Sequence, residues 1–427
     1  MRIFISILLM NITICAYSLT YALQQTINQN DLKALRKEFK KNPEKLTTIG
    51  NTLLKEGHLV EAREFAILAN KKAKNYAPAY LLLGDIELAN NNTSDAFVLY
   101  NKIIDIAPND SSGYYRIQDI EGKNFYSSLE YKKAIDSWKV IPTTKMSLFT
   151  IIDYATANYY LGNHADGFRI ANQGINLYPN DIELKRIAMR CATELEEYTE
   201  ARQLQQQLLK IKNSTELSYL DYYYSGLIYD GLNLYDKAIS YYHKVLESKV
   251  DSNIIQKTVT LAKLSNDYVK INDLKNAIIY YKLYISSKDE VTDNDYTNLA
   301  NLHLKYSDTI DNQKEKEENL IEADSIYKII ANNNELVAYM RANINSKLDP
   351  DSQKGLAKPY FEELIKIIES KHEKNEEDLN KLITAYHYLM TYSFLQENDK
   401  KRAKEYSSKI LEIQPDFSPA IQIKKIK

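Results

Sequence analysis

The sequence is poor in the residues that make tight turns, with only 11 glycines and 9 prolines among 427 residues. Folds rich in β-strands use such residues at many short turns, so their scarcity disfavours a sandwich or barrel. Cysteine is scarcer still: Cys15 and Cys191 are the only two, and the first lies in an apolar N-terminal segment. Removal of that segment leaves one thiol, which excludes an internal disulfide.

Neither sign of charge predominates, since 55 lysines and arginines face 57 aspartates and glutamates, a formal net charge of −2. No bulk electrostatic attraction therefore draws the chain to nucleic acid, and we expect no nucleic-acid partner. The charged share of 26% and the hydrophobic share of 44% are those of a folded protein.

Signatures of catalysis and of metal binding are also missing. The six histidines are scattered, and none lies three or four residues from another histidine or a cysteine. The sequence has no glycine-rich phosphate loop, no GxSxG elbow and no EF-hand loop. We therefore expect no metal, no cofactor, no small-molecule substrate and no enzymatic activity. The remaining enzyme hypothesis is a glycan- or peptide-processing activity hidden in the irregular stretches.

The N-terminus has the pattern of a secretory signal. After Arg2 no charged residue occurs before Asp31, and Ile3–Met10 form a short apolar core. Thr20 and Ala22 place small residues at −3 and −1 of a cut before Leu23. The pattern predicts a signal peptide over residues 1–22 and an exported protein of the periplasm or cell envelope. The alternative is an uncleaved membrane anchor over residues 3–23.

One motif recurs along the rest of the chain: a small residue, often with an aromatic four residues later and mostly an apolar residue seven later. Several intervals between the small residues are 33 or 34 residues, and the offsets place one stripe along a helix. The small residues are Ala62, Ala96, Ala134, Gly167, Ala201, Ala238, Ala277, Ala323, Ala357 and Ala403.

A second helix is expected before each of these, because another small residue precedes several of them by twelve positions. Examples are Gly50, Gly84 and Gly226. Turn residues such as Gly57-His58 lie between, so each unit reads as two antiparallel helices that approach closely at small residues. The unit around Ala134 shows no clean first helix, and the unit around Ala323 contains an insertion near Ser307–Glu318.

This pattern resembles the tetratricopeptide repeat, and Ala77–Asp110 is its best copy, with Gly84, Ala96, Tyr100 and Pro108 in register. The resemblance implies an all-α fold: a right-handed superhelical solenoid of about ten antiparallel helix pairs. We place the solenoid at residues 43–415, after a linker and capping helix at 23–42 and before a C-terminal capping segment at 416–427.

A narrower resemblance begins at Ala338–Phe361 (AYMRANINSKLDPDSQKGLAKPYF) and continues in the last repeat. These stretches are similar to a family of secreted tetratricopeptide proteins of Gram-negative bacteria. The similarity implies a location in the bacterial envelope and no enzymatic activity. A membrane is then contacted only through other envelope proteins.

By the geometry of the resembled family, one face of each first helix lines the concave side of the solenoid. The candidate binding site there combines a basic pair with aromatic residues on either side: Arg186 and Arg190, flanked by Tyr159 and Tyr160 and by Tyr223 and Tyr224. Such a groove would suit an extended or helical partner segment with an acidic residue among apolar ones. Alternatively, the tyrosines serve packing and the arginines are solvated.

The functional prediction is a non-enzymatic protein–protein interaction scaffold that binds another protein or a peptide segment in this groove. The alternative is a structural subunit of a larger envelope complex for secretion or outer-membrane assembly, which would self-associate or co-purify in fixed stoichiometry.

Overall fold

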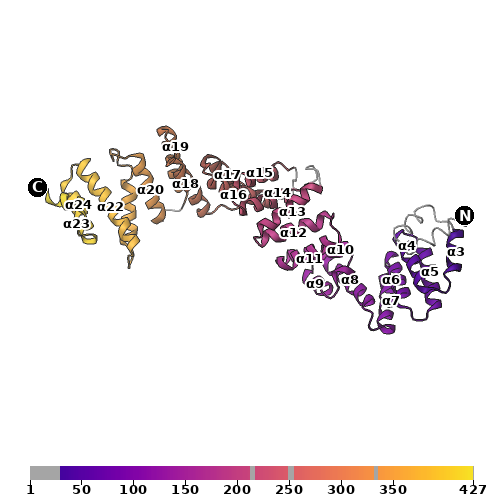
Figure 1. Cartoon of the computed structure of the whole chain (residues 1–427). Helices are drawn as coiled ribbons and strands as arrows, with labels where there is room; N and C mark the ends of the chain where they lie inside the picture. The colour runs from indigo at the N-terminus through magenta and orange to yellow at the C-terminus, as the bar shows by residue number, and fades with distance from the viewer. Residues whose placement is uncertain (1–28, 212–216, 249–253, 331–334, 427) are drawn as a thin grey trace. The chain divides into compact units, whose positions relative to one another are not determined.

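The computed structural model describes residues 29–211, 217–248, 254–330 and 335–426. Over these ranges every regular element is a helix, 22 α-helices and one short 3₁₀ helix, with no strand (Figure 1). The all-α prediction is confirmed. The predicted signal peptide (1–22) and the first residues of the predicted linker lie outside the described residues.

The helices form two compact units, which divide between Ile211 and Lys212. The first unit contains α3 (Gln29–Glu38), α4 (Pro43–Lys55), α5 (Leu59–Lys72), α6 (Ala77–Ala89), α7 (Thr93–Ile106), α8 (Ser112–Ser127), α9 (Tyr131–Trp138), the 3₁₀ helix η2 (Thr143–Lys145), α10 (Leu148–Tyr160), α11 (His164–Leu177), α12 (Ile182–Glu194) and α13 (Tyr198–Ile211).

The second unit contains α14 (Tyr219–Gly231), α15 (Tyr235–Glu247), α16 (Ile254–Lys270), α17 (Leu274–Ser286), α18 (Asp293–Ser307), α19 (Gln313–Tyr327), α20 (Glu335–Leu348), α21 (Lys358–Glu369), α22 (Glu376–Leu395), α23 (Lys400–Ile413) and α24 (Ser418–Lys425).

The helices from α4 to α23 pack as ten consecutive pairs, α4 with α5 through α22 with α23 (Figure 1). We call the even-numbered member of each pair the first helix and the odd-numbered member the second helix. Every second helix except α21 contains one of the ten small residues. In that pair the small residue, Ala357, lies just before the first residue of α21. The predicted number of helix pairs is therefore confirmed, whereas the right-handed superhelix stays a prediction.

The ten small residues lie where two helices of a pair touch. All nine alanines among them are fully buried, at 0% exposure, and Gly167 is buried as well. In three pairs the aromatic residue four positions later covers a glycine of the first helix. A Cβ atom on Gly226 would lie 2.3 Å from Cε1 of Tyr242, and one on Gly84 would lie 2.4 Å from Cε1 of Tyr100. Only glycine leaves room for these rings.

The unit around Ala134 has a regular first helix, contrary to the expectation from its sequence. This helix is α8, and its Gly122 lies twelve residues before Ala134. A Cβ atom on Gly122 would lie 2.3 Å from Nε1 of Trp138, so the same contact is made with a larger ring. The insertion near Ser307–Glu318 is only partly a loop, because α19 begins at Gln313.

A short helix lies at each end of the ten pairs. In α3, Leu32 is buried, and Phe39 just beyond the helix is buried too. In α24 the buried residue is Ala420, whose carbonyl oxygen accepts a hydrogen bond of 2.7 Å from the hydroxyl of Ser407. Both helices therefore cover apolar surface of the adjacent pair.

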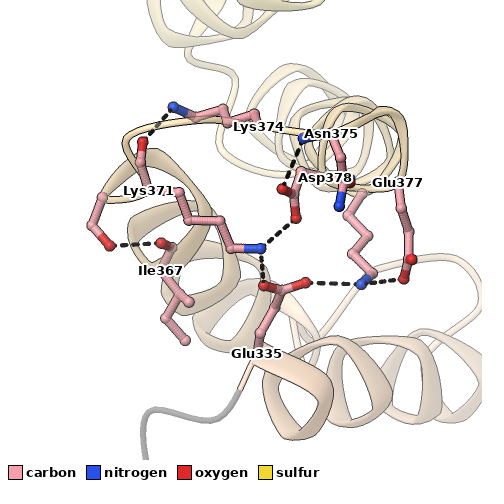
Figure 2. Close-up of polar contacts among 9 residues, drawn as sticks. Glu335, Ile367, Lys371, Lys374, Asn375, Glu377 and Asp378 are labelled. Carbon is pink, nitrogen blue, oxygen red and sulfur yellow. Dashed lines mark hydrogen bonds and ion pairs between the residues drawn. The ribbon is translucent and has the colours of Figure 1, made fainter.

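A network of charged side chains joins α20, α22 and the turn after α21 (Figure 2). Lys371 Nζ lies 2.5 Å from an oxygen of Glu335 and 2.5 Å from an oxygen of Asp378. Lys381 Nζ lies 2.8 Å from the other oxygen of Glu335 and 2.6 Å from Glu377. Opposite charges alternate through the network, so each lysine is shared by two carboxylates.

The contact between Gly226 and Tyr242 gives a stability prediction. Helix propensity alone would make Gly226→Ala stabilising by about 1 kcal/mol. The clash with the ring adds an overpacking cost of about 1–3 kcal/mol, so we expect a net loss, seen as a lower midpoint of urea unfolding. Adding Tyr242→Leu should recover part of the loss, and Ser240→Ala on the exposed side of α15 is the control. A midpoint that rises with Gly226→Ala contradicts the account.

The charge network gives a prediction about pH. Burial alone would raise the pKa of Glu335, but hydrogen bonds from Lys371 and Lys381 outweigh it and the pKa is lowered. The hydrogen bond from Lys371 likewise lowers the pKa of Asp378. A carboxylate whose pKa is lower in the folded protein stabilises the fold fully at a pH above its pKa in the unfolded chain, which is 4.5 for Glu335 and 3.8 for Asp378. This stabilisation is lost as the pH falls through the pKa of the folded protein.

We therefore expect Glu335→Gln to lower the melting temperature at neutral pH and to have little effect once wild-type Glu335 is itself protonated in acid. Thermal melts of both proteins across this pH range measure the difference. Glu373→Gln, at an exposed site in the turn after α21, is the control and should show no pH-dependent difference in melting temperature. The account is contradicted if Glu335→Gln lowers the melting temperature equally at neutral and at acid pH.

Candidate functional site

The first helices of the first unit lie side by side, so their exposed side chains share one surface. Helix α10 packs against both α8 and α12, and α4 packs against α6. Between α6 and α8, Arg116 donates to both carboxylate oxygens of Asp85, through Nε at 2.8 Å and Nη2 at 2.9 Å. We call the surface formed by α6, α8, α10 and α12 the first-helix face.

A cleft of about 540 Å³ opens beside α6 and α8. Two loops complete it, the one between α7 and α8 and the one between α9 and α10 that contains η2. Its lining mixes apolar, polar and charged side chains: Leu81, Asn109, Asp110, Ser111, Ser112, Tyr115, Arg116, Asp119, Ile141, Lys145 and Met146. The size and the mixed lining suit one or two side chains of a bound segment.

The acidic groups of the cleft are already bonded within the protein. Asp119 accepts hydrogen bonds from Thr150 at 2.7 Å and from Lys123 at 2.7 Å. Asp110 accepts one from the backbone N–H of Ser112 at 2.9 Å. Lys145, in contrast, is exposed and its ammonium has no hydrogen-bond or ion-pair partner among the described residues. The cleft therefore offers a ligand the positive charge of Lys145, beside the carboxylate of Asp110.

Helix α10 exposes two large aromatic side chains on the same surface. Phe149 is 73% exposed and Tyr160 is 59% exposed. They are eleven residues apart, close to three full turns, so both project from one side of the helix. Asp153 lies between them, and its partial burial raises its pKa, an effect that nearby Lys123 opposes. Exposed aromatic rings around a half-buried carboxylate are unusual on a surface without a partner.

Further tyrosines support the ring of Tyr160. It stacks on Tyr131 with ring centres 5.2 Å apart and an interplanar angle of 25°. Tyr131 in turn contacts Tyr126, whose pKa is raised to about 12 by burial and by the nearby charge of Asp153. This contact with Tyr131 holds the Tyr160 ring in one orientation while leaving much of it exposed.

Four of the six residues predicted as a binding site belong to this unit. Tyr159 and Tyr160 end α10, and the ring of Tyr159 contacts those of Tyr160 at 5.7 Å and His164 at 5.5 Å. Arg186 and Arg190 lie one turn apart on α12, both half-buried. Arg186 forms an ion pair of 2.6 Å with Glu183 of its own helix. Its guanidinium is thus held by the protein rather than simply solvated.

The other two predicted residues, Tyr223 and Tyr224, lie on α14 in the second unit. Tyr223 is half-buried and packs its ring against Tyr224 at 5.8 Å and Tyr242 at 6.2 Å. Tyr224 is only 5% exposed, which favours packing over contact with a partner. The six residues thus belong to two separate units, and their action as one site stays a prediction.

Comparison with known proteins identifies the repeat. The family model of the tetratricopeptide repeat matches residues 222–249, which cover most of α14 and all of α15, with Gly226 and Tyr242 in contact. The chain therefore contains a tetratricopeptide repeat at these residues. No curated protein matches its sequence.

Several solved structures of tetratricopeptide repeat proteins are similar to this chain. The C-terminal part of a repeat protein from Cytophaga hutchinsonii is 21% identical, with 64% of this chain and 100% of that chain covered and a TM-score of 0.44. PilF of Pseudomonas aeruginosa is 13% identical, with coverage of 54% and 96% and a TM-score of 0.35. A repeat protein from Parabacteroides merdae is 13% identical, with coverage of 70% and 96% and a TM-score of 0.29.

Tetratricopeptide repeats bind other proteins or peptides, so the matched repeat suggests a role in protein interaction. The described residues contain no group of three or more histidine, cysteine or acidic side chains placed to hold a metal ion. Burial raises the pKa of the Cys191 thiol to about 12, which leaves it protonated and unreactive. Among the described helices, none has the length and apolar character needed to cross a membrane.

Sequence reasoning did not identify the cleft or Phe149. The cleft depends on α8, which was not recognised because its sequence departs from the repeat. The spacing of twelve between Gly122 and Ala134 was the signal that could have revealed this helix. Phe149 reads as an ordinary apolar residue near the start of a helix, and only its 73% exposure distinguishes it.

Proposed function

We propose that this repeat protein is a non-enzymatic scaffold of the bacterial cell envelope whose first-helix face binds a segment of a partner protein. The observation that carries the proposal is the pair Phe149 and Tyr160, two large aromatic side chains exposed on one side of a first helix. Large rigid aromatics of this kind dominate the binding energy of protein interfaces. The neighbouring cleft supplies a second anchor point.

The chemistry of the surface indicates what the partner segment contains. Phe149 and Tyr160 favour apolar or aromatic side chains, whose burial would remove them from water. Lys145 at the cleft favours a carboxylate, because its side chain is exposed and the nearby Asp119 is already bonded to Lys123 and Thr150. The expected segment therefore has apolar residues followed or preceded by an acidic one. Arg186 and Arg190 on α12 would favour the same charge.

The envelope location rests on the sequence: the uncharged apolar run before Asp31 and the resemblance of Ala338–Phe361 to secreted bacterial repeat proteins. A structural subunit of an envelope complex remains the second function predicted from the sequence. A stable subunit would keep its partners in fixed stoichiometry, whereas a scaffold for transient clients would not.

The test is capture of partners from envelope and cytosolic extracts on the immobilised protein, followed by mass spectrometry and affinity measurement with the captured partner. We expect the partner in the envelope extract. Phe149→Ser with Tyr160→Ser should weaken binding by about thirtyfold or more, since one lost hot-spot anchor costs roughly 2 kcal/mol. Lys145→Glu should weaken it further and make the remaining affinity less sensitive to salt.

The matched control is Val98→Ser on the second helix α7, where the side chain is 68% exposed on a different helix of the same unit. It should leave binding unchanged, and all variants should keep the wild-type melting temperature because the altered side chains are exposed. Full binding by the Phe149 and Tyr160 variant would contradict the site. In the same assay, Arg186→Ala with Tyr223→Ala tests the site predicted from the sequence.

A further inference from the structure

Exposed apolar side chains on the second helices of the second unit are confined to two neighbouring helices. On α17, Ile279 and Leu283 are each 46% exposed, and on α19, Ile321 is 54% exposed. In the described part of this unit, the other second helices (α15, α21 and α23) expose no large apolar side chain. The exposed side chains therefore form a local patch rather than the scatter of single residues found on most surfaces.

Helices α17 and α19 both pack on α18 and approach each other through side chains at this patch. Ile278 of α17 and Leu320 of α19 belong to one buried apolar cluster. On the exposed side, Lys282 Nζ lies 3.8 Å from an oxygen of Glu322, so the two helices carry an ion pair at the surface. Both partners are about half exposed, at 47% and 57%, which makes the pair weak and leaves both charges accessible.

The two halves of the patch have opposite charge. On α17 the exposed charges beside Ile279 are Lys275 and Lys282. On α19 the exposed charges within one turn of Ile321 are Glu317, Glu318 and Glu322. One half is thus apolar and basic, and the other is apolar and acidic. A surface built in this way complements itself after a half-turn rotation.

We propose that a second copy of this chain docks on the patch, related by a two-fold axis that passes beside the Lys282–Glu322 pair. The rotation places α17 of each copy against α19 of the other. Lys282 of one copy then faces Glu322 of the second copy, and the four charges form a square of alternating sign. Ile279, Leu283 and Ile321 lie around this square and are removed from water. The contact is independent of the partner-binding function proposed above.

A charge-swap experiment on the purified full chain tests the proposal by sedimentation equilibrium over a wide range of concentration. We expect the wild-type protein to dimerise with a dissociation constant on the order of 10 μM, as for a small interface. Lys282→Glu alone and Glu322→Lys alone each place like charges opposite one another at two symmetric positions. Each should therefore weaken the dimer by about tenfold or more.

An equimolar mixture of these two variants restores opposite charges at both positions and should form a heterodimer at wild-type affinity. A heterodimer would also exclude a folding defect as the cause of the weaker homodimers, because both variants must be folded to form it. Ile279→Ser with Leu283→Ser should also abolish self-association, while Ile67→Ser on α5, 52% exposed in the first unit, should not. A monomeric wild type, dimeric single variants or a mixture that stays monomeric would each overturn the proposal.

Discussion

The structure depends on the close contact between the two helices of each pair. A small residue on the second helix lies against the first, and in three pairs an aromatic ring covers a glycine of the first helix: Tyr100 over Gly84, Trp138 over Gly122 and Tyr242 over Gly226. Because a Cβ atom would lie within 2.4 Å of a ring atom at each of these glycines, the contact admits no larger residue. Ten repetitions of one local contact thus replace a single large core.

This contact explains why most of the fold could be predicted from the sequence. Each helix pair needs a buried small residue, so small residues recur at regular intervals along the chain. These intervals predict the helix pairs and their number. The prediction failed at α8, where only Gly122 preserves the spacing and the neighbouring residues depart from the repeat. It also failed to place the start of α19, since a charged stretch such as Gln313–Glu318 is compatible with either loop or helix.

The candidate site was harder to predict because it depends on exposure, which the repeat pattern does not encode. Tyr242 on the second helix α15 is 0% exposed, whereas Tyr160 at the end of the first helix α10 is 59% exposed, and residue type alone does not distinguish them. Likewise, the sequence predicts Arg186 as a basic group for a ligand but does not predict its ion pair with Glu183. The cleft near Lys145 requires two loops and two helices to come together, which no single motif records.

The two proposed contact surfaces lie on different kinds of helix. In the first unit, Phe149 and Tyr160 lie on a first helix next to a cleft with an available positive charge. In the second unit, Ile279 and Ile321 lie on second helices between opposite charges. The two helices of a pair expose different faces, so the two proposed contacts use different surfaces.

The central claim is that the first-helix face of the first unit contacts the partner, and site-specific photo-crosslinking tests it most directly. A photoreactive phenylalanine analogue would replace Phe149, or Val98 on the second helix α7, and would be irradiated in intact cells of the native host. The account predicts that the partner segment is crosslinked from position 149 and not from position 98. Crosslinking from position 98 alone would contradict it.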